Sequence, residues 1–411
     1  MKQVTIAIVG AGSRGHGYAN YILKHQDTVK VVAVAEPNEF RRNRMVKEHN
    51  IPAENVFNTY QEMLIRPKLA DAVIIATQDQ MHIEPTLGFA AKKYDILLEK
   101  PIAVTADECT QICKAVKEAG IIFGVCFVLR YTPHFRKMRE LIQSKVVGDV
   151  VTFRHLEKVG YWHQAHSFVR GNWRNTSESC PMILAKCCHD LDILNFLLGK
   201  KCVNISSYGS LKFFKKENQP SGAADRCMDC RFADTCTYSA KSFYMGRLHR
   251  GSLLWPLSVI TDDLTEDGVT RALKEGPYGR CVFACDNDAV DNQVLNFVYE
   301  DGITGNMTMT AFSQDVSRES EFRCTHGVIK GDGHKITVTH FGNPEPEVYD
   351  TSSAGQSLSG GHGGGDAGLM DDFVRAIAMQ DQAQLGATPD EMLAGHLMAF
   401  AAEESRLQAK Y

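Results

Sequence analysis

The chain has 411 residues, of which 44% are hydrophobic and 23% charged, and its formal net charge is −4. This length predicts two domains, because a single hydrophobic core rarely extends beyond about 300 residues. The nearly balanced charge excludes the strong basic field of a nucleic-acid-binding protein, and no apolar run is long enough to span a membrane. No signal peptide is recognisable, so we expect a cytoplasmic protein without nucleic-acid or membrane partners.

A glycine-rich turn follows the first predicted strand. Val4–Val9 is an almost unbroken apolar run, as expected for a strand buried on both faces. Gly10, Gly12 and Gly15 come next, and a helix is predicted over His16–Lys24. In dinucleotide-binding folds the first glycine permits the tight turn and the second lets the backbone approach a pyrophosphate. The third lets the helix pack closely on the strand. The strand, the glycines and the helix together predict a nucleotide site.

The start of this helix and the end of the next strand indicate which nucleotide binds. Ser13 and Arg14 lie at the helix start, where free N–H groups favour phosphate. A second apolar strand ends in Glu36, at the distance where a carboxylate accepts hydrogen bonds from the adenosine ribose. A carboxylate repels a 2′-phosphate, so Glu36 favours NAD over NADP. Arg41 and Arg42 follow closely and would weaken this preference, unless they belong to a solvated helix face.

Strands and helices continue to alternate over the first third of the chain. We predict further strands at Asp71–Thr77, Asp95–Leu98 and Ile121–Val128, and helices at His82–Lys92 and Thr105–Ala119. This alternation predicts a doubly wound parallel (Rossmann) sheet over residues 1–126, with ligands at the carboxyl ends of its strands.

Two strand ends carry a recognisable pattern. The segment Ala76-Thr77-Gln78-Asp79-Gln80-Met81-His82 follows one strand, and Glu99-Lys100-Pro101 follows the next. With the N-terminal glycines, they resemble the glucose-fructose oxidoreductase/inositol dehydrogenase/MocA family. The resemblance covers the first domain and, more loosely, residues 127–411. It implies that Thr77, His82 and Glu99 belong to the cofactor site and that Lys100 lies beside the nicotinamide and the reacting carbinol.

The position of Lys100 agrees with this implication. A lysine at the carboxyl end of an apolar strand lies in the ligand crevice, unless its side chain leaves the sheet for solvent. Partial burial there lowers the pKa of a lysine and lets it polarise or orient a hydroxyl group.

An aromatic and polar segment marks the second domain. It contains Trp162, His163, Arg170, Trp173 and Arg174. Aromatic faces stack on the C–H surfaces of sugars, and the polar groups bind hydroxyls, so we expect substrate contacts here. The alternative is a loop whose tryptophans pack against the core.

A helix ending at Gly199 follows this segment. The family carries Asp-x-x-x-His on this helix, and the resemblance places the histidine at His189 and a following acid at Asp192. The family aspartate falls on Ala185 and is therefore missing, while Lys186 shares a helical face with His189. We expect His189 to accept the hydroxyl proton, with Lys100 and Lys186 stabilising the oxyanion, unless His189 is only a core histidine.

The rest of the second domain is predicted to be α+β. Alternating segments predict strands at Ile205–Phe214, Val290–Tyr299, Gly302–Ser313, Glu321–Ile329 and Lys335–His340. They fit an open, mostly antiparallel sheet with helices on one face. Its other face would be free to pair with another subunit, so we expect a homodimer or homotetramer.

Cysteines cluster in an insertion near residues 220–286. In a chain of thirteen cysteines without an export signal, metal binding or burial explains them better than disulfides do. The C-x2-C spacing favours a structural zinc site, with an iron–sulfur cluster or plain reduced thiols as alternatives. The candidate ligands are Cys227, Cys230, Cys236 and either Cys281 or Cys285.

A glycine-rich stretch precedes the last two predicted helices. His362 and Asp366 in this stretch are candidate substrate contacts on a closing loop. The alternative is a linker in which Asp366 caps the helix Leu369–Met379. Pro389–Gln408 is predicted to be an amphipathic helix that packs back on the body.

Three functions fit these features. The first is an NAD-dependent oxidoreductase that moves a hydride to or from a secondary hydroxyl of a sugar, glycoside or inositol. The second cleaves a glycosidic bond by transient oxidation with tightly bound NAD. The third is an NAD-binding sensor without turnover.

Overall fold

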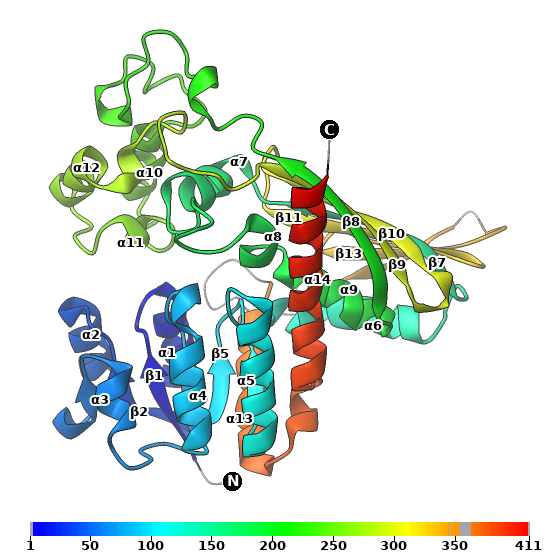
Figure 1. Ribbon diagram of the computed structural model, residues 1–411, viewed down its shortest axis with the longest axis horizontal. Coiled ribbons are helices and arrows are strands. Elements are labelled where there is room, and N and C mark those ends of the chain that lie inside the picture. The colour runs from blue at the N-terminus through cyan, green and yellow to red at the C-terminus, as the bar shows by residue number, and fades with distance from the viewer. Residues whose placement is uncertain (1–2, 344, 353–362, 410–411) are drawn as a thin grey trace.

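The computed structural model describes residues 3–343, 345–352 and 363–409, which form two sheets, each with its own helices (Figure 1). The first sheet has six parallel strands in the order β3-β2-β1-β4-β5-β6. The strands are β1 (Val4–Val9), β2 (Val29–Ala35), β3 (Val56–Phe57), β4 (Ala72–Ile75), β5 (Asp95–Leu98) and β6 (Phe123–Val125). The helices between them are α1 (Ser13–Leu23), α2 (Glu39–His49), α3 (Tyr60–Leu64), α4 (Ile83–Ala91) and α5 (Ala106–Ala119). The doubly wound sheet predicted from the sequence is confirmed.

Local signals account for most of these elements. The Thr105 side chain accepts a hydrogen bond from the backbone N–H of Glu108, 3.2 Å away, so α5 begins where predicted. The last strand is shorter than predicted, because the chain leaves the sheet after Val125 and enters a 3-10 turn, η3 (Val128–Tyr131). This turn leads into the second domain.

The second sheet has eight strands in the order β14-β13-β12-β11-β7-β10-β9-β8. Its neighbours are antiparallel except for β7 and β10. The strands are β7 (Val150–Lys158), β8 (Cys202–Ser210), β9 (Asn292–Tyr299), β10 (Thr304–Thr310), β11 (Ser317–Cys324), β12 (Gly327–Gly331), β13 (Lys335–His340) and β14 (Glu347–Asp350). The mostly antiparallel sheet is therefore confirmed, although the segment predicted as one strand over Glu321–Ile329 is the hairpin of β11 and β12.

Helices cover one face of the second sheet. They include α6 (Pro133–Gln143), α9 (Cys188–Leu198) and α14 (Pro389–Gln408), and α14 also packs against α5 of the first domain (Figure 1). The short helices α7 (Tyr161–His163) and α8 (Met182–Ala185) precede α9. The late helix α13 (Gly365–Met379) packs with residues of β1 and β2 in one hydrophobic cluster.

The insertion between β8 and β9 forms a separate helical lobe. It contains α10 (Ala240–His249), α11 (Leu257–Ile260) and α12 (Glu266–Glu275), at the upper left of Figure 1. A small apolar core of its own includes Tyr244, Leu257 and Leu273. The lobe is therefore held together by burial of side chains from these helices.

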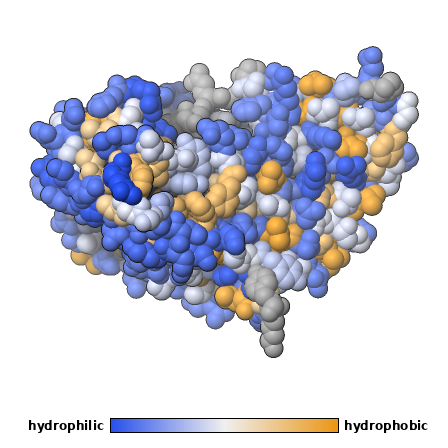
Figure 2. Space-filling view, turned by 90° about the horizontal axis from the view of Figure 1, so that it is seen from above, coloured by the Kyte–Doolittle hydropathy of each residue, from blue (hydrophilic) through white to orange (hydrophobic). Residues whose placement is uncertain are grey.

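The outer face of the second sheet exposes apolar side chains. Tyr208 on β8 and Val294 and Val298 on β9 are 49, 43 and 37% exposed. In Figure 2, hydrophobic residues lie among polar ones over this half of the molecule. Across the described residues, none of the helices combines the length and apolarity needed to cross a bilayer.

A capping box fixes the start of α14. The Thr388 hydroxyl accepts from the backbone N–H of Glu391, and the Glu391 carboxylate accepts from the backbone N–H of Thr388. We predict that Thr388→Ala lowers the free energy of unfolding by about 1 kcal/mol, as measured by urea denaturation. Thr110→Ala, an exposed change within α5, is the control and is expected to change it by less than about 0.5 kcal/mol. Equal stability of the two variants would show that the box contributes nothing.

Candidate functional site

The glycine turn after β1 is shaped as its sequence predicts. Gly10 has a φ of +88°, and a Cβ there would lie 2.5 Å from the Ala76 carbonyl oxygen. A Cβ on Gly15 would lie 1.9 Å from the carbonyl oxygen of Gly10. By contrast, the nearest atom to a Cβ on Gly12 would be an Arg41 nitrogen at 3.9 Å. Gly10 and Gly15 are thus required by packing, while Gly12 leaves its side of the turn open.

Glu36 closes onto this turn from the end of β2. Its carboxylate accepts from the backbone N–H groups of Ala11 at 2.6 Å and of Asn38 at 2.8 Å, and the residue is only 6% exposed. Each carboxylate oxygen has a second lone pair for a further donor. The predicted ribose-binding residue therefore lies beside the glycines, with acceptor capacity left.

The end of β4 offers an unsatisfied polar atom. The hydroxyl oxygen of Thr77 is buried and has no hydrogen-bond partner within the part of the chain that the structure describes. A buried hydroxyl without a partner is costly by roughly 1–3 kcal/mol, so it is suited to a ligand that supplies the missing bond.

Arg14 ties the glycine turn to two other elements. Its Nε lies 2.6 Å from the carboxylate of Glu99 at the end of β5, and its Nη2 lies 2.6 Å from Asp366 in the first turn of α13. The Tyr18 hydroxyl also donates to Glu99, at 2.7 Å. Although burial acts in the opposite direction, Arg14 and Lys100 lower the pKa of Glu99. Asp366, predicted as a helix cap or substrate contact, here serves as a counter-ion.

Lys100 reaches across to the second domain. Its Nζ donates to the carbonyl oxygen of Ala185 at 2.9 Å and lies 5.7 Å from the ring centre of Trp173. Ala185 is the position at which the resembled family carries its aspartate. The indole N–H of Trp173 donates to Asp79 at 2.7 Å. Lys100 therefore lies between the strand ends of the first domain and the α8 segment of the second.

Two histidines hold the turn that carries Lys100. His82, fully buried, lies with Nδ1 2.7 Å from the Pro101 carbonyl oxygen and Nε2 3.3 Å from that of Thr77. His396 of α14 is also fully buried, and its Nε2 accepts from the backbone N–H of Ile102 at 2.8 Å. His82 is a predicted cofactor residue, whereas no local pattern of the sequence indicates His396, because only the docking of α14 brings it here.

The helix that carries His189 is interrupted, contrary to the prediction of one continuous helix. α8 ends at Ala185 and α9 begins at Cys188, so Lys186 lies in the break. The prediction that Lys186 and His189 lie on one face of a continuous helix is therefore wrong. His189 is in the first turn of α9, is 6% exposed and meets the ring of Phe127 edge-on at 6.0 Å.

A buried network of charges lies beside this break. Lys186 Nζ is 3.2 Å from the carboxylate of Glu157 on β7, and Arg318 of β11 contacts Glu157 at 3.0 Å and Asp190 at 2.6 Å. His155 lies 2.9 Å from Asp190. Burial raises the pKa of Glu157, whereas Arg318 and His155 lower that of Asp190 despite its burial. The charge of Lys186 is thus balanced by Glu157.

Asp192, predicted as a substrate contact, also lies in an ion pair. Its two carboxylate oxygens accept from Nε and Nη2 of Arg130, each at 2.7 Å, and the residue is 1% exposed. Such a buried pair satisfies both charges, and breaking it would leave one of them uncompensated.

The aromatic segment packs mainly against the insertion. Trp162 stacks on Phe243 at 5.5 Å and lies 5.4 Å from Trp255, and His163 meets Trp255 at 5.1 Å. Trp162 and His163 keep part of their surface exposed. The packing alternative is therefore correct for one side of these rings, and their exposed parts are still available to a ligand.

The two predicted arginines of this segment bind protein groups. Arg170, 3% exposed, donates to the carbonyl oxygens of Arg280 at 2.6 Å and Tyr238 at 2.7 Å. Arg174 pairs with Asp286 at 2.9 Å. Both arginines therefore anchor the insertion, and their contact with a substrate stays a prediction.

The insertion also approaches the nucleotide end of the crevice. Nε of Arg41 on α2 lies 3.7 Å from the carboxylate of Asp262, between α11 and α12. Arg41 is thus occupied by an insertion carboxylate instead of lying on a wholly solvated helix face.

The cysteines do not form the predicted zinc site. Among the described residues, no group of three or more His, Cys, Asp or Glu side chains is arranged to hold a metal ion. Cys227 and Cys281 are buried, and the thiol of Cys285 donates to the Cys281 carbonyl oxygen at 3.2 Å. Cys230 and Cys236 are partly exposed. The alternative of reduced thiols in a compact lobe fits this arrangement.

His362, which the sequence predicts as a substrate contact, lies outside the described residues.

We predict that the stability of the protein depends on pH through His396. Burial, together with the charge of Lys100, lowers the pKa of His396 to about 4. The unfolded state, with a usual histidine pKa of about 6.5, binds more protons between these values, so stability falls as the pH is lowered. Between pH 7.5 and pH 5 this loss is about 2 kcal/mol for this residue.

The measurement is urea denaturation at both pH values for His396→Gln, whose loss is expected to be smaller by that amount. The control is His249→Gln, which changes an exposed histidine. The assignment fails if His396→Gln and the unchanged protein lose the same stability.

Sequence comparison finds relatives among known oxidoreductases. YteT of Bacillus subtilis, named as an oxidoreductase, is 27% identical over 77% of this chain and 74% of its own length. The 2,7-anhydro-N-acetylneuraminate hydratase of Escherichia coli is 28% identical over 48% of this chain and 50% of its own. The scyllo-inositol 2-dehydrogenase (NAD(+)) of Bacillus subtilis is 26% identical over 51% and 58%. The chain thus matches only about half the length of the latter two.

Solved structures share the whole fold. A levoglucosan dehydrogenase in complex with NADH and levoglucosan superposes with a TM-score of 0.71 at 16% identity, covering 99% of this chain and 98% of its own. An oxidoreductase from Agrobacterium radiobacter in complex with NAD+, L-tartaric acid and magnesium gives 0.71 at 14% identity, covering 100% and 98%. At these identities the likeness shows the fold alone.

Two family models together match most of the chain. Residues 4–127 match the oxidoreductase family with an NAD-binding Rossmann fold, and residues 139–406 match the C-terminal alpha/beta domain of the same family. With the glycine turn, the Lys100 turn and the two-sheet fold in place, the chain belongs to the glucose-fructose oxidoreductase/inositol dehydrogenase/MocA family of oxidoreductases.

Proposed function

We propose that this protein is an NAD-dependent dehydrogenase of a secondary hydroxyl on a sugar, glycoside or inositol. The observation that carries the proposal is Lys100, which lies at the carboxyl end of β5 and reaches the α8–α9 segment that bears His189. The named activity of one sequence relative supports it, since that relative is a scyllo-inositol 2-dehydrogenase (NAD(+)).

The residues of the first domain fit NAD. The open side of Gly12 leaves room for a pyrophosphate next to the start of α1, which has no acidic residue in its first turn. Glu36 retains acceptor capacity for ribose hydroxyls, and the buried Thr77 hydroxyl lacks a partner among the described residues. The carboxylate of Glu36 disfavours NADP, whose 2′-phosphate it would repel.

In this proposal Lys100 and His189 share the alcohol chemistry. Bound NAD supplies the hydride acceptor. The ammonium group of Lys100 exchanges the Ala185 carbonyl for the substrate oxygen and stabilises its developing negative charge. His189 takes the hydroxyl proton. Lys186, proposed from the sequence to help stabilise the oxyanion, is paired with Glu157, so its contribution to that charge would be smaller than that of Lys100.

A second candidate reaction is redox-neutral. The Arg41–Asp262 contact brings the insertion against the nucleotide end of the crevice, which would slow the exchange of NAD. One relative is named as a hydratase, an activity without net oxidation. Under this alternative, transient oxidation acidifies a neighbouring C–H bond, elimination follows, and the hydride returns.

One experiment separates these functions and the NAD-binding sensor. The purified protein is assayed for copurified NAD, and sugars, glycosides and inositols are then screened for NADH formation by absorbance. Free NADH supports the dehydrogenase, whereas bound NAD and product formation without net NADH support the redox-neutral reaction. NAD binding without any turnover supports the sensor.

We predict that Lys100→Ala lowers kcat by about a hundredfold or more, because the developing oxyanion loses the charge that stabilises it. Binding of NADH, measured by the fluorescence of its reduced nicotinamide, should remain. Lys114→Ala, which removes an exposed lysine of α5, is the matched control and should leave kcat unchanged. Full turnover in Lys100→Ala would remove the catalytic assignment from this lysine.

We also propose that the protein is a homo-oligomer through the outer face of the second sheet. The exposed side chains of Tyr208, Val294 and Val298 form an apolar surface of the kind that subunits bury. Replacing Val294 and Val298 by Glu should place unpaired charges in that interface and reduce the mass seen by size-exclusion chromatography with light scattering. Ile65→Glu, at an exposed apolar site of the first domain, should not. A monomeric wild type would refute the interface.

A further inference from the structure

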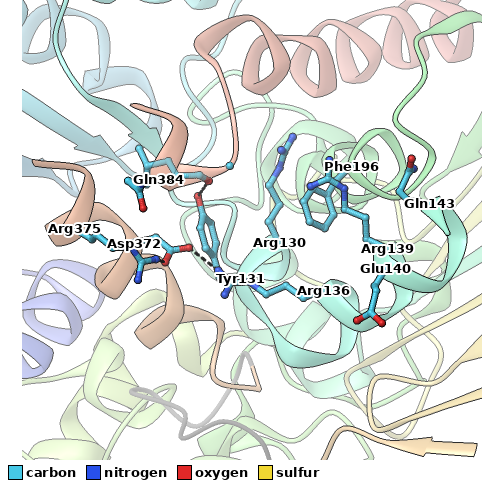
Figure 3. Close-up of a pocket in the computed structure, with 12 residues that line it drawn as sticks. Arg130, Tyr131, Arg136, Arg139, Glu140, Gln143, Phe196, Asp372, Arg375 and Gln384 are labelled. Atoms are coloured by element: carbon cyan, nitrogen blue, oxygen red, sulfur yellow. Dashed lines mark hydrogen bonds and ion pairs between the residues drawn. The ribbon is translucent and has the colours of Figure 1, made fainter. Parts of the chain in front are cut away.

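A cavity of about 560 Å³ lies outside the crevice described above (Figure 3). It is bounded by η3, α6, α9, α13 and the turn η9 (Gln382–Leu385). We call it the arginine pocket, because four guanidinium groups line it, those of Arg130, Arg136, Arg139 and Arg375. Its volume falls in the usual range for small-molecule sites.

The charges in the arginine pocket do not balance. Arg130 is neutralised by Asp192 at 2.7 Å. Arg136, at 2.6 Å, and Arg375 share the single carboxylate of Asp372. Four guanidinium groups against two carboxylates leave an excess of two positive charges. The one further lining carboxylate, Glu140, pairs with Lys137 at 2.7 Å and so removes none of this excess.

Among the described residues, Arg139 has no carboxylate within salt-bridge distance, although that of Glu391 acts on it from further away. Its guanidinium lies 4.2 Å from the ring centre of Phe196, and that of Arg130 lies 5.2 Å from the same ring. Partial burial and the charge of Arg130 lower the pKa of Arg139, although the carboxylate of Glu391 acts in the opposite direction. Two like charges over one ring are an arrangement that a bound anion would relieve.

Arg139 and Arg136 are placed so that one ligand can contact both side chains. They are three residues apart on α6, so their side chains leave the same face of the helix. Arg375 approaches from α13, on the other side of Tyr131 in Figure 3. A planar guanidinium group binds two oxygens of a phosphate at once, and several such groups around one cavity are typical of phosphate recognition.

We propose that the arginine pocket binds a phosphate group, either as free phosphate or as the monoester of a small sugar-like molecule. The phosphate oxygens accept from Arg139 and Arg136, with Arg375 nearby, and Tyr131 and Phe196 provide the apolar walls. The pocket is joined to the candidate active site by two helices, since α9 carries both Asp192 and His189, and α13 carries both Asp372 and Asp366.

The test is isothermal titration of inorganic phosphate into the protein, with NAD at saturation so that the glycine turn is not available to the anion. We expect the wild type to bind about one equivalent in the millimolar range or tighter. Arg139→Gln should weaken this binding about tenfold or more, because a charge-assisted hydrogen bond is lost. Arg375→Gln is a second variant at a half-exposed side chain, expected to act in the same direction.

Arg231→Gln is the matched control, because Arg231 also lies over a phenylalanine ring, at 4.6 Å from Phe232, but in the insertion. It should bind phosphate like the wild type. A parallel titration with a hexose monophosphate identifies the source: tighter binding than phosphate, lost in Arg139→Gln, supports a phosphate monoester, and equal binding supports free phosphate. The proposal is overturned if the wild type binds neither probe, or if both arginine variants bind them as the wild type does.

Discussion

The carboxylate of Glu99 is the constraint around which the candidate active site is assembled. It lies at the end of a strand with four buried residues and is itself only 6% exposed, so it requires positive charge and hydrogen-bond donors close by. Arg14 supplies the charge from the first turn of α1, and Tyr18 donates a hydrogen bond. The same guanidinium binds Asp366 of α13. Satisfying one buried charge thereby fixes the glycine turn, the start of the Lys100 turn and a helix from the end of the chain.

A second set of buried charges organises the other wall of the crevice. The resembled family has an aspartate where this chain has Ala185, and here the carbonyl oxygen of that residue holds Lys100. Carboxylates are nevertheless present close by, because Glu157 and Asp190 lie fully buried with Arg318 between them. Lys186 completes the balance of charge. In this wall, an ion-pair network of Glu157, Asp190, Arg318 and Lys186 therefore lies beside the break between α8 and α9.

Local sequence patterns were sufficient to predict most strands and helices of the first domain. The predicted strands Val4–Val9 and Asp95–Leu98 have the same bounds in the structure. A strand that is buried on both faces has an almost continuous apolar sequence, which makes its ends easy to recognise. The break at Lys186 and the hairpin of β11 and β12 were missed, since their apolar spacing continues through the interruption. The internal partners of Asp192 and Arg170 were missed for a related reason. The residues next to a polar side chain in the sequence do not indicate whether it contacts a ligand or an internal partner.

The sequence by itself determined the family, the two-domain fold and the nucleotide turn, because these depend on short-range features: glycine conformations, strand composition and helix caps. Only the tertiary structure decided which charges meet. Arg14 forms an ion pair with Asp366, and Arg130 forms one with Asp192. His396, on the last helix, accepts a hydrogen bond from the backbone N–H of Ile102. Such pairings join residues that are far apart along the chain, and they form only because each buried polar group must find a partner once the helices have docked. The opening feature of the sequence, a glycine turn for NAD, is thus local. The chemistry proposed at Lys100 depends on contacts that no local pattern encodes.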